Sequence, residues 1–161
     1  MEKRSITINY QSYDSIEELS QIERDCVVKS EAIVDGAHAP YSEFKVSSVV
    51  LFEDGTLHVG TNQENAAYPS GLCAERVAVF GAKANFPNKH IQSVFIYTKK
   101  HNDKPFSPCG ACRQSILEYE QQQSSPISVY MKSGNSSIYR FDSIKDLMPL
   151  SFDGNEAFKK S

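Results

Sequence analysis

The sequence predicts an α/β fold in which a mixed five-stranded sheet is flanked by helices. The elements follow the order helix, strand, strand, helix, strand, helix, strand, strand, helix, and such alternation favours a partly parallel sheet with helices on its faces. Residues 91–97 (IQSVFIY) are apolar with little alternation, as expected of a central strand covered on both sides. A chain of 161 residues, 40% of them hydrophobic, fits one domain with one sizeable core.

The N-terminal part is predicted to contain an edge strand and a long helix. Residues 5–13 alternate loosely and could form a short edge strand. Asp14 or Ser15 caps a helix that continues to about residue 37. Apolar residues recur along it at helical spacing and predict a buried stripe of Ile16, Leu19, Ile22, Cys26, Ile33 and Ala37. Cys26 is therefore interpreted as a small core residue.

A loop at 38–44 leads to a hairpin and a second helix. Strands are expected at 46–52 and 57–62, joined by the tight turn Glu53-Asp54-Gly55. A helix is expected at 73–84, stopped by Asn85-Phe86-Pro87-Asn88. Its predicted inner face consists of Val77, Phe80 and Ala84.

The C-terminal half continues with a polar loop at 99–107 and a helix at 110–119. The inner face of that helix is predicted to be Cys112, Ser115, Ile116 and Tyr119. Strands follow at 127–131 and 138–141, and Asp142 or Ser143 caps a short last helix. We expect an N-terminal extension at 1–14, one domain at 15–152 and a C-terminal tail at 153–161.

The net charge and the hydropathy of the sequence limit the classes of molecule that the protein is expected to bind. The net charge of −3 argues against a large nucleic-acid-binding surface, which would carry a basic excess. No apolar run approaches the roughly 18 residues that cross a bilayer, and the N-terminus lacks the apolar region of a secretory signal. We therefore expect a cytoplasmic protein with a small-molecule ligand and no nucleic-acid or membrane partner. In that compartment clustered cysteines indicate a metal or catalysis, with disulfides as the alternative.

Two short stretches carry the chemistry: Cys-Ala-Glu-Arg at 73–76 and Pro-Cys-Gly-Ala-Cys at 108–112, which together contain three of the four cysteines. Cys109 and Cys112 are three residues apart at a helix start, so both sulfurs lie on one face. Cys73 would come from the start of the other helix, and helix N-termini favour the thiolate form that zinc binds. Three soft ligands beside an acid predict a catalytic zinc site, since a structural site would use four protein ligands.

The two charged residues after Cys73 are candidates for proton transfer and charge compensation. Glu75 could face the open coordination position without ligating and move protons there; the alternative is an exposed glutamate in the first turn of a helix. Arg76 could donate hydrogen bonds to a thiolate and offset its charge; the alternative is a surface arginine.

A metal ligand, a non-ligand glutamate and then Pro-Cys-x-x-Cys form the known pattern of zinc deaminases. The stretch GTNQENAAYPSGLCAER at 60–76, with SPCGACRQ at 107–114, resembles cytidine deaminases of the homotetrameric, three-cysteine type. The resemblance runs from about residue 17 to 152 and includes Tyr41-Ser42-x-Phe44-x-Val46 and Asp146-Leu147-x-Pro149-x-x-Phe152. It implies a three-layer α/β/α cytidine deaminase-like fold. Ser47-Ser48 depart from the Gly-Ala usual in the family, which leaves the local helix–sheet spacing open.

The resemblance also implies an activity and a role for each matching residue. Zinc, one ion per subunit, would be held by Cys73, Cys109 and Cys112, with Glu75 as proton shuttle. Substrate would be bound by Phe44 beneath the pyrimidine, Asn62 and Glu64 at the ribose 3′-hydroxyl, the Ala74 backbone at the base, and Phe152 from a neighbouring subunit of a homotetramer. The implied reaction is hydrolytic deamination of cytidine and deoxycytidine to uridine and deoxyuridine, a step of pyrimidine salvage.

Three alternatives stay open on the sequence. A related deaminase of the blasticidin S type shares the PCxxCRQ pattern, but Asn62-x-Glu64 and the Phe152 region favour a nucleoside. A polynucleotide-editing deaminase is disfavoured by the acidic balance and by the lack of a basic, aromatic strand-binding run. A non-catalytic zinc-stabilised binding protein would need a closed fourth coordination position and no Glu75.

Overall fold

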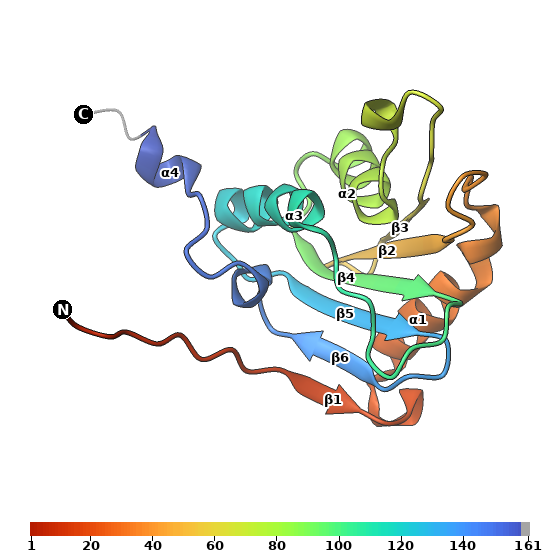
Figure 1. Ribbon diagram of the computed structural model, residues 1–161, viewed down its shortest axis with the longest axis horizontal. Helices are drawn as coiled ribbons and strands as arrows, with labels where there is room; N and C mark the ends of the chain where they lie inside the picture. The colour runs from red at the N-terminus through yellow and green to blue at the C-terminus, as the bar shows by residue number, and fades with distance from the viewer. Residues whose placement is uncertain (159–161) are drawn as a thin grey trace.

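The computed structural model describes residues 1–158, and its centre is a mixed sheet of six strands in the order β1-β6-β5-β4-β2-β3. Figure 1 shows the strands, which are β1 (Gln11–Tyr13), β2 (Val46–Phe52), β3 (Leu57–Thr61), β4 (Ile91–Thr98), β5 (Ser128–Ser133) and β6 (Ile138–Phe141). β4 and β5 pair in parallel, and every other neighbouring pair is antiparallel. The predicted mixed sheet is confirmed.

The predicted count of five strands is wrong, because the edge strand of the N-terminal extension joins the sheet. β1 pairs with β6 and places Gln11 opposite Arg140. This strand covers only the last three residues of the expected 5–13 strand. Ahead of it the chain runs extended past the sheet edge (Figure 1), and the Tyr10 ring packs 4.7 Å from that of Tyr139.

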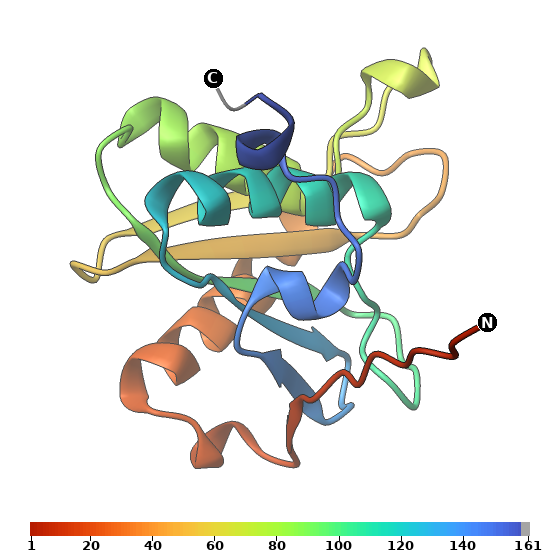
Figure 2. The same cartoon turned by 90° about the vertical axis from the view of Figure 1, so that its left-hand side faces the viewer.

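Helices cover both faces of the sheet, so the three-layer prediction is confirmed. The helices are α1 (Gln21–Ile33), α2 (Ala74–Asn85), α3 (Gly110–Gln123) and the short α4 (Gly154–Ala157). Single 3₁₀ turns occur as η1 (Ile16–Glu18), η2 (Val34–Gly36), η3 (Tyr68–Ser70) and η4 (Ile144–Leu147). Figure 2 shows α2 and α3 on one face of the sheet and α1 on the other. Within residues 1–158, no helix has the length and apolar character needed to span a bilayer.

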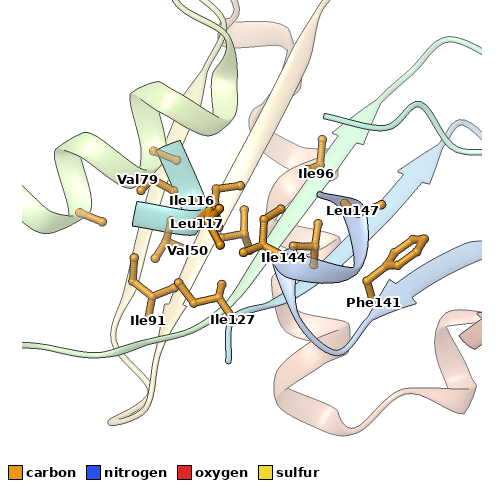
Figure 3. Packing of buried hydrophobic residues seen from close by; sticks show 14 of the residues in the cluster. Val50, Val79, Ile91, Ile96, Ile116, Leu117, Ile127, Phe141, Ile144 and Leu147 are labelled. Atoms are coloured by element: carbon orange, nitrogen blue, oxygen red, sulfur yellow. The ribbon is translucent and has the colours of Figure 1, made fainter. Parts of the chain in front are cut away.

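Alternating side chains of the central strands divide the core into two clusters. Figure 3 shows the larger cluster, under α2, α3 and η4, which includes Val50, Val79, Ile91, Ile96, Ile116, Leu117, Ile127, Phe141, Ile144 and Leu147. The cluster under α1 consists of Leu19, Cys26, Val27, Val49, Leu51, Phe95, Tyr130 and Ile138. In β4, Phe95 faces α1 while its neighbours Val94 and Ile96 face α2 and α3. The prediction that this strand is covered on both sides is confirmed.

The expected single helix at 14–37 is three pieces. Ser15 caps η1, Leu19 is extended (φ −83°, ψ 157°), and Ser20 begins α1 with a capping box to Glu23. The apolar spacing continues through this break, which is why the pattern indicated one helix. Cys26 is fully buried as predicted, whereas Ile22 is exposed.

The predicted inner face of α2 is also wrong. Phe80 is 41% exposed, and the buried face consists of Ala74, Glu75, Ala78, Val79 and Ala82. The reason is the close approach of α2 to β3: a Cβ on Gly60 would lie 2.5 Å from the Ala78 backbone nitrogen. Small residues therefore face the sheet, and the larger side chain turns outward. In α3, Cys112 and Ile116 are buried as predicted.

The serine pair at the start of β2 is fully buried, and the two side chains face opposite layers. The Ser47 hydroxyl donates a 2.6 Å hydrogen bond to the Ser30 carbonyl in the last turn of α1. Ser48 Oγ has no hydrogen-bond partner among the described residues. The sheet and helices thus accommodate serines at both positions.

Candidate metal and substrate site

Two helix starts bring the three cysteines together. Cys73 is the N-cap of α2 and Cys109 the N-cap of α3, while Cys112 lies in the first turn of α3. Both N-cap residues have extended backbones, and their carbonyls accept the first helical hydrogen bonds, from Val77 and Arg113. α2 and α3 cover the same face of the sheet (Figure 2), and the proximity of their cysteine sulfurs shows that their N-terminal turns meet.

The sulfur atoms have the spacing of a zinc site. Cys109 Sγ lies 3.9 Å from Cys73 Sγ and 3.5 Å from Cys112 Sγ, and all three atoms are within 4.8 Å of one another. Tetrahedral zinc with bonds of about 2.3 Å to sulfur separates two thiolates by about 3.8 Å. Among residues 1–158 this metal-ligand group has three members. A non-catalytic, zinc-stabilised binding protein would need a fourth ligand to close the coordination shell.

The Cys73 thiol is set up to lose its proton. Hydrogen bonding from the Cys112 thiol, and then from Arg76, lowers the pKa of Cys73 to about 5. Arg76 Nη2 lies 3.9 Å from Cys73 Sγ, so a guanidinium stands beside the sulfur.

Glu75 is a buried carboxyl group beside the cysteines. Only 5% of the residue is exposed, and burial raises the pKa of its carboxyl group above the ordinary value. Buried carboxyl groups usually have ion or hydrogen-bond partners. An exposed glutamate in the first turn of a helix, the alternative considered above, does not describe this residue.

A cavity of about 640 Å³ opens over these groups. Of the residues predicted from the sequence, its wall contains Phe44, Asn62, Glu64, Cys73, Ala74, Glu75, Arg76 and Cys109. Cys112 lies behind the wall, fully buried. The volume is in the range of ordinary small-ligand sites.

Asn62 connects the cavity to the loop before β2. Its Oδ1 accepts a 2.8 Å hydrogen bond from the Val46 N–H, and its Nδ2 donates to the Phe44 carbonyl at 3.0 Å. The amide therefore holds the backbone on both sides of Lys45 and thereby places the Phe44 ring at the cavity wall.

Glu64, two residues after Asn62 in the sequence, holds an earlier part of the same loop. Its carboxylate accepts hydrogen bonds from the Tyr41 N–H at 3.0 Å, the Ser42 N–H at 3.2 Å and the Ser42 hydroxyl. The Ser42 hydroxyl bond, followed by the backbone bonds, lowers the pKa of Glu64. This pair was predicted as a ribose contact, and its bracing of the loop was missed.

Two further residues near the cysteines were missed. Arg113 follows Cys112 and holds two segments: its guanidinium donates to the Ser107 hydroxyl and the Pro108 carbonyl, both at 2.8 Å, and to the Leu147 carbonyl at 2.7 Å. Phe106 lines the cavity although it belongs to a loop that was interpreted only as polar. The sequence held a usable signal for both residues. Arg113 comes directly after the Cys-x-x-Cys pattern, and Phe106 is a lone aromatic residue next to the ligand stretch.

Phe152 lies away from the cavity of its own chain. It is 59% exposed, and its ring centroid is 6.3 Å from that of Phe158. If this side chain contacts substrate, it does so in another copy of the chain.

Comparisons with known proteins agree with this geometry. The family model described as "Cytidine and deoxycytidylate deaminase zinc-binding region" matches residues 22–125, which include both cysteine stretches. A cytidine deaminase of Mycoplasma genitalium is 36% identical over 129 residues, which cover 80% of this chain and 89% of that protein. One from Sporosarcina psychrophila is 39% identical over 93 residues, covering 58% and 66%. The crystal structure of cytidine deaminase from Burkholderia pseudomallei matches with a TM-score of 0.71 and 30% identity, covering 83% of this chain and 100% of that one.

Proposed function

This chain belongs to the family of zinc-dependent cytidine deaminases, and we propose that its cavity binds cytidine or deoxycytidine and hydrolyses the C4 amino group of the base. One observation carries the proposal: two members of a three-thiol cluster, Cys73 and Cys109, line the same ligand-sized cavity as a buried carboxyl group. Water is the second substrate, and the products are ammonia and uridine or deoxyuridine.

Cys73, Cys109 and Cys112 would hold one zinc ion per subunit. When bound, zinc supplies a Lewis acid that lowers the pKa of water and so makes a nucleophile available at neutral pH. Three thiolates would leave this group with excess negative charge, and Arg76, 3.9 Å from Cys73 Sγ, offsets part of it. Thiols stay reduced in the cytoplasm, which is where we place the enzyme.

Glu75 would move the protons. Its position in the first turn of α2, next to a ligand and in the cavity wall, lets its carboxylate take a proton from the attacking water. It would deliver one proton to N3 of the base as the bond to C4 forms. Glu75 would then take the remaining proton of the added water from the new C4 hydroxyl and pass it to the amino group, which leaves as ammonia as the C4–N bond breaks and the C4 carbonyl forms.

The remaining wall residues would bind the nucleoside. Phe44 offers an aromatic face to the pyrimidine, and the Ala74 backbone lies in the wall where it can contact the base. Asn62 keeps one amide N–H, and the Glu64 oxygens keep some acceptor capacity, beyond the bonds that hold the loop. Both can therefore also bind a ribose hydroxyl. Phe152 of a neighbouring subunit in a homotetramer would complete the site.

Replacement of Glu75 by glutamine tests the proposal. The amide keeps the shape of the side chain and cannot shuttle protons, so we expect kcat for cytidine to fall about 10²- to 10⁴-fold. The loss of ultraviolet absorbance of cytidine measures the rate, and atomic spectroscopy measures zinc per chain, which should stay at the parent value. The control is Glu118→Gln, an exposed position on α3.

Two results would contradict the proposal. One is a zinc-loaded Glu75→Gln protein that deaminates cytidine at the parent rate. The other is a parent protein that converts blasticidin S and neither cytidine nor deoxycytidine, which would support the antibiotic-deaminase alternative.

A further inference from the structure

The loop between β4 and α3 makes two contacts with Phe44, the aromatic residue assigned to the base. The Phe106 ring meets the Phe44 ring edge-on, with 5.2 Å between centroids and an interplanar angle of 79°. Lys100 Nζ lies over the Phe44 ring, 5.8 Å from its centroid. The loop at 99–107, whose sequence indicated only a polar segment, thus packs against Phe44, and Phe106 and Ser107 line the cavity.

Phe106 is held in place on both sides. Its backbone N–H donates a 2.9 Å hydrogen bond to the hydroxyl of Ser133, a fully buried residue at the end of β5. The next residue, Ser107, accepts from Arg113, and Cys109 follows two positions later. The backbone that carries the ring is therefore anchored to both the sheet and the cysteine stretch, which suits a binding surface.

The free protein leaves this large apolar ring partly uncovered. Phe106 is 36% exposed and lines the cavity, so part of its ring remains accessible next to Phe44. A flat heterocycle that stacks on Phe44 would turn its edge toward a ring standing at 79° to Phe44. Edge-to-face contact between aromatic rings is favourable, and a bound base would also remove the exposed apolar surface from water.

We propose that Phe106 is a second substrate-contacting aromatic residue, which forms the wall of the base subsite perpendicular to Phe44. The proposal rests on the proposed deaminase function. It assigns Phe106 to recognition of the flat base and not of the sugar, so its contribution is the same for ribo- and deoxyribonucleosides. Because the contact is made in the ground state and the transition state alike, it acts on KM more than on kcat.

The test compares Phe106→Ala and Phe106→Leu with Phe86→Ala and Phe86→Leu. Phe86 forms a similar edge-on pair with Phe52 (5.5 Å, 74°) and also lies under a lysine, with Lys89 Nζ 4.6 Å from its ring centroid. It is not among the residues that line the cavity. The Phe86 variants therefore report the effect of breaking an aromatic pair without touching the substrate site.

We expect KM for cytidine to rise about tenfold in Phe106→Ala, the value of one base–aromatic contact, and to rise less in Phe106→Leu. kcat should change little, and the ratio of kcat/KM for cytidine to that for deoxycytidine should stay at the parent value. Calorimetric titration with uridine gives a readout without turnover, and its Kd should rise by a similar factor. Zinc content and KM of the Phe86 variants should match the parent.

Three results would contradict the inference. A folded, zinc-loaded Phe106→Ala or Phe106→Leu protein with parent KM and parent uridine Kd overturns it. A change in the cytidine-to-deoxycytidine ratio also overturns it, because that places the ring at the sugar. If the parent protein turns over neither nucleoside, the proposed function fails first and the inference falls with it.

Discussion

At the scale of single residues, the four cysteines divide into two environments. Cys73, Cys109 and Cys112 meet at two helix starts beside the cavity, whereas Cys26 is fully buried under the sheet in the α1 cluster. Both assignments could be predicted from the sequence, because spacing at a helix start and a position on an apolar stripe are local properties. Burial raises the pKa of Cys26 to about 12, and the negative charges of Asp25 and Glu23 contribute.

The raised pKa of Cys26 predicts a loss of stability in alkali. The ordinary thiol pKa is 9.0, so from pH 9 toward 12 the unfolded chain releases this proton while the folded chain retains it. The stability that depends on the neutral thiol is thus fully present below pH 9 and decreases as the pH rises. We expect the free energy of unfolding, measured in urea at pH 8 to 11, to fall less steeply for Cys26→Ala than for the parent.

The comparison of slopes isolates Cys26, because all other titrating groups are shared by the two proteins. Cys26→Ala should be less stable than the parent at pH 8, since it also loses buried volume. Parallel curves for parent and variant above pH 9 would contradict the prediction.

Other residue roles required the folded structure. Asn62 and Glu64 could be placed near the cavity from their spacing, but the groups that they hold lie 16 to 23 residues away in the sequence. No local pattern reveals such partners, because they come together only when the 38–46 loop folds against the end of β3. Phe106 was missed for the same reason: its contact with Phe44 joins two loops.

At the scale of secondary-structure elements, the sequence predicted which elements exist better than it predicted their ends and faces. All the core strands and the α2 and α3 helices lie within a few residues of their predicted bounds. The predicted inner face of α2 was wrong because the prediction ranked side chains by their apolar character and ignored their size. The observed face is selected by the space above Gly60, which admits alanine and excludes phenylalanine.

The serine pair in β2 yields a prediction with opposite signs at adjacent positions. Ser47→Ala removes a 2.6 Å hydrogen bond to the last turn of α1 and should lower the free energy of unfolding by about 1 kcal/mol. Ser48→Ala removes a buried hydroxyl that has no partner among the described residues, and it should raise that free energy by about 1 kcal/mol. Urea unfolding of the two variants at equal protein concentration measures both changes.

The two variants control for each other, because both positions are fully buried in one strand and both changes remove one oxygen. A shift in the same direction for both would show that the difference in hydrogen bonding does not decide their stability. Since Ser30 lies in the last turn of α1, where carbonyl groups run out of helical partners, the effect of Ser47→Ala should also appear as faster amide exchange there.

At the scale of the whole molecule, the layers could be predicted, whereas the strand at the sheet edge was placed only within the broad range 5–13 and was left out of the strand count. The alternation of elements and the apolar 91–97 segment indicated helices on both faces. β1 adds a sixth strand through only three residue pairs with β6, and such a short edge strand has almost no pattern of its own. The position of the C-terminal segment depends on tertiary contacts, since Arg113 binds the Leu147 carbonyl and so links that segment to the cysteine stretch.

The same segment leads to the last prediction, which concerns assembly. Leu150 is 94% exposed and Phe152 is 59% exposed, and neither lines the cavity of its own chain. If Phe152 completes the site of a neighbouring copy, Phe152→Ala should reduce cytidine turnover, and Glu75→Gln should abolish nearly all of it. Co-expression of the two variants with different tags should then restore activity above the mean of the separate proteins.

Complementation is expected because the two defects lie in different chains of one composite site. A Phe152→Ala subunit still provides its own Glu75, and a Glu75→Gln neighbour provides the missing phenylalanine, so their shared site has every group. The matched control replaces the Glu75→Gln partner by the double variant Glu75→Gln/Phe152→Ala, which can supply neither group and should restore nothing. Full activity of Phe152→Ala alone, or a monomeric parent protein at assay concentration, would instead mean that each chain builds its site without a neighbour.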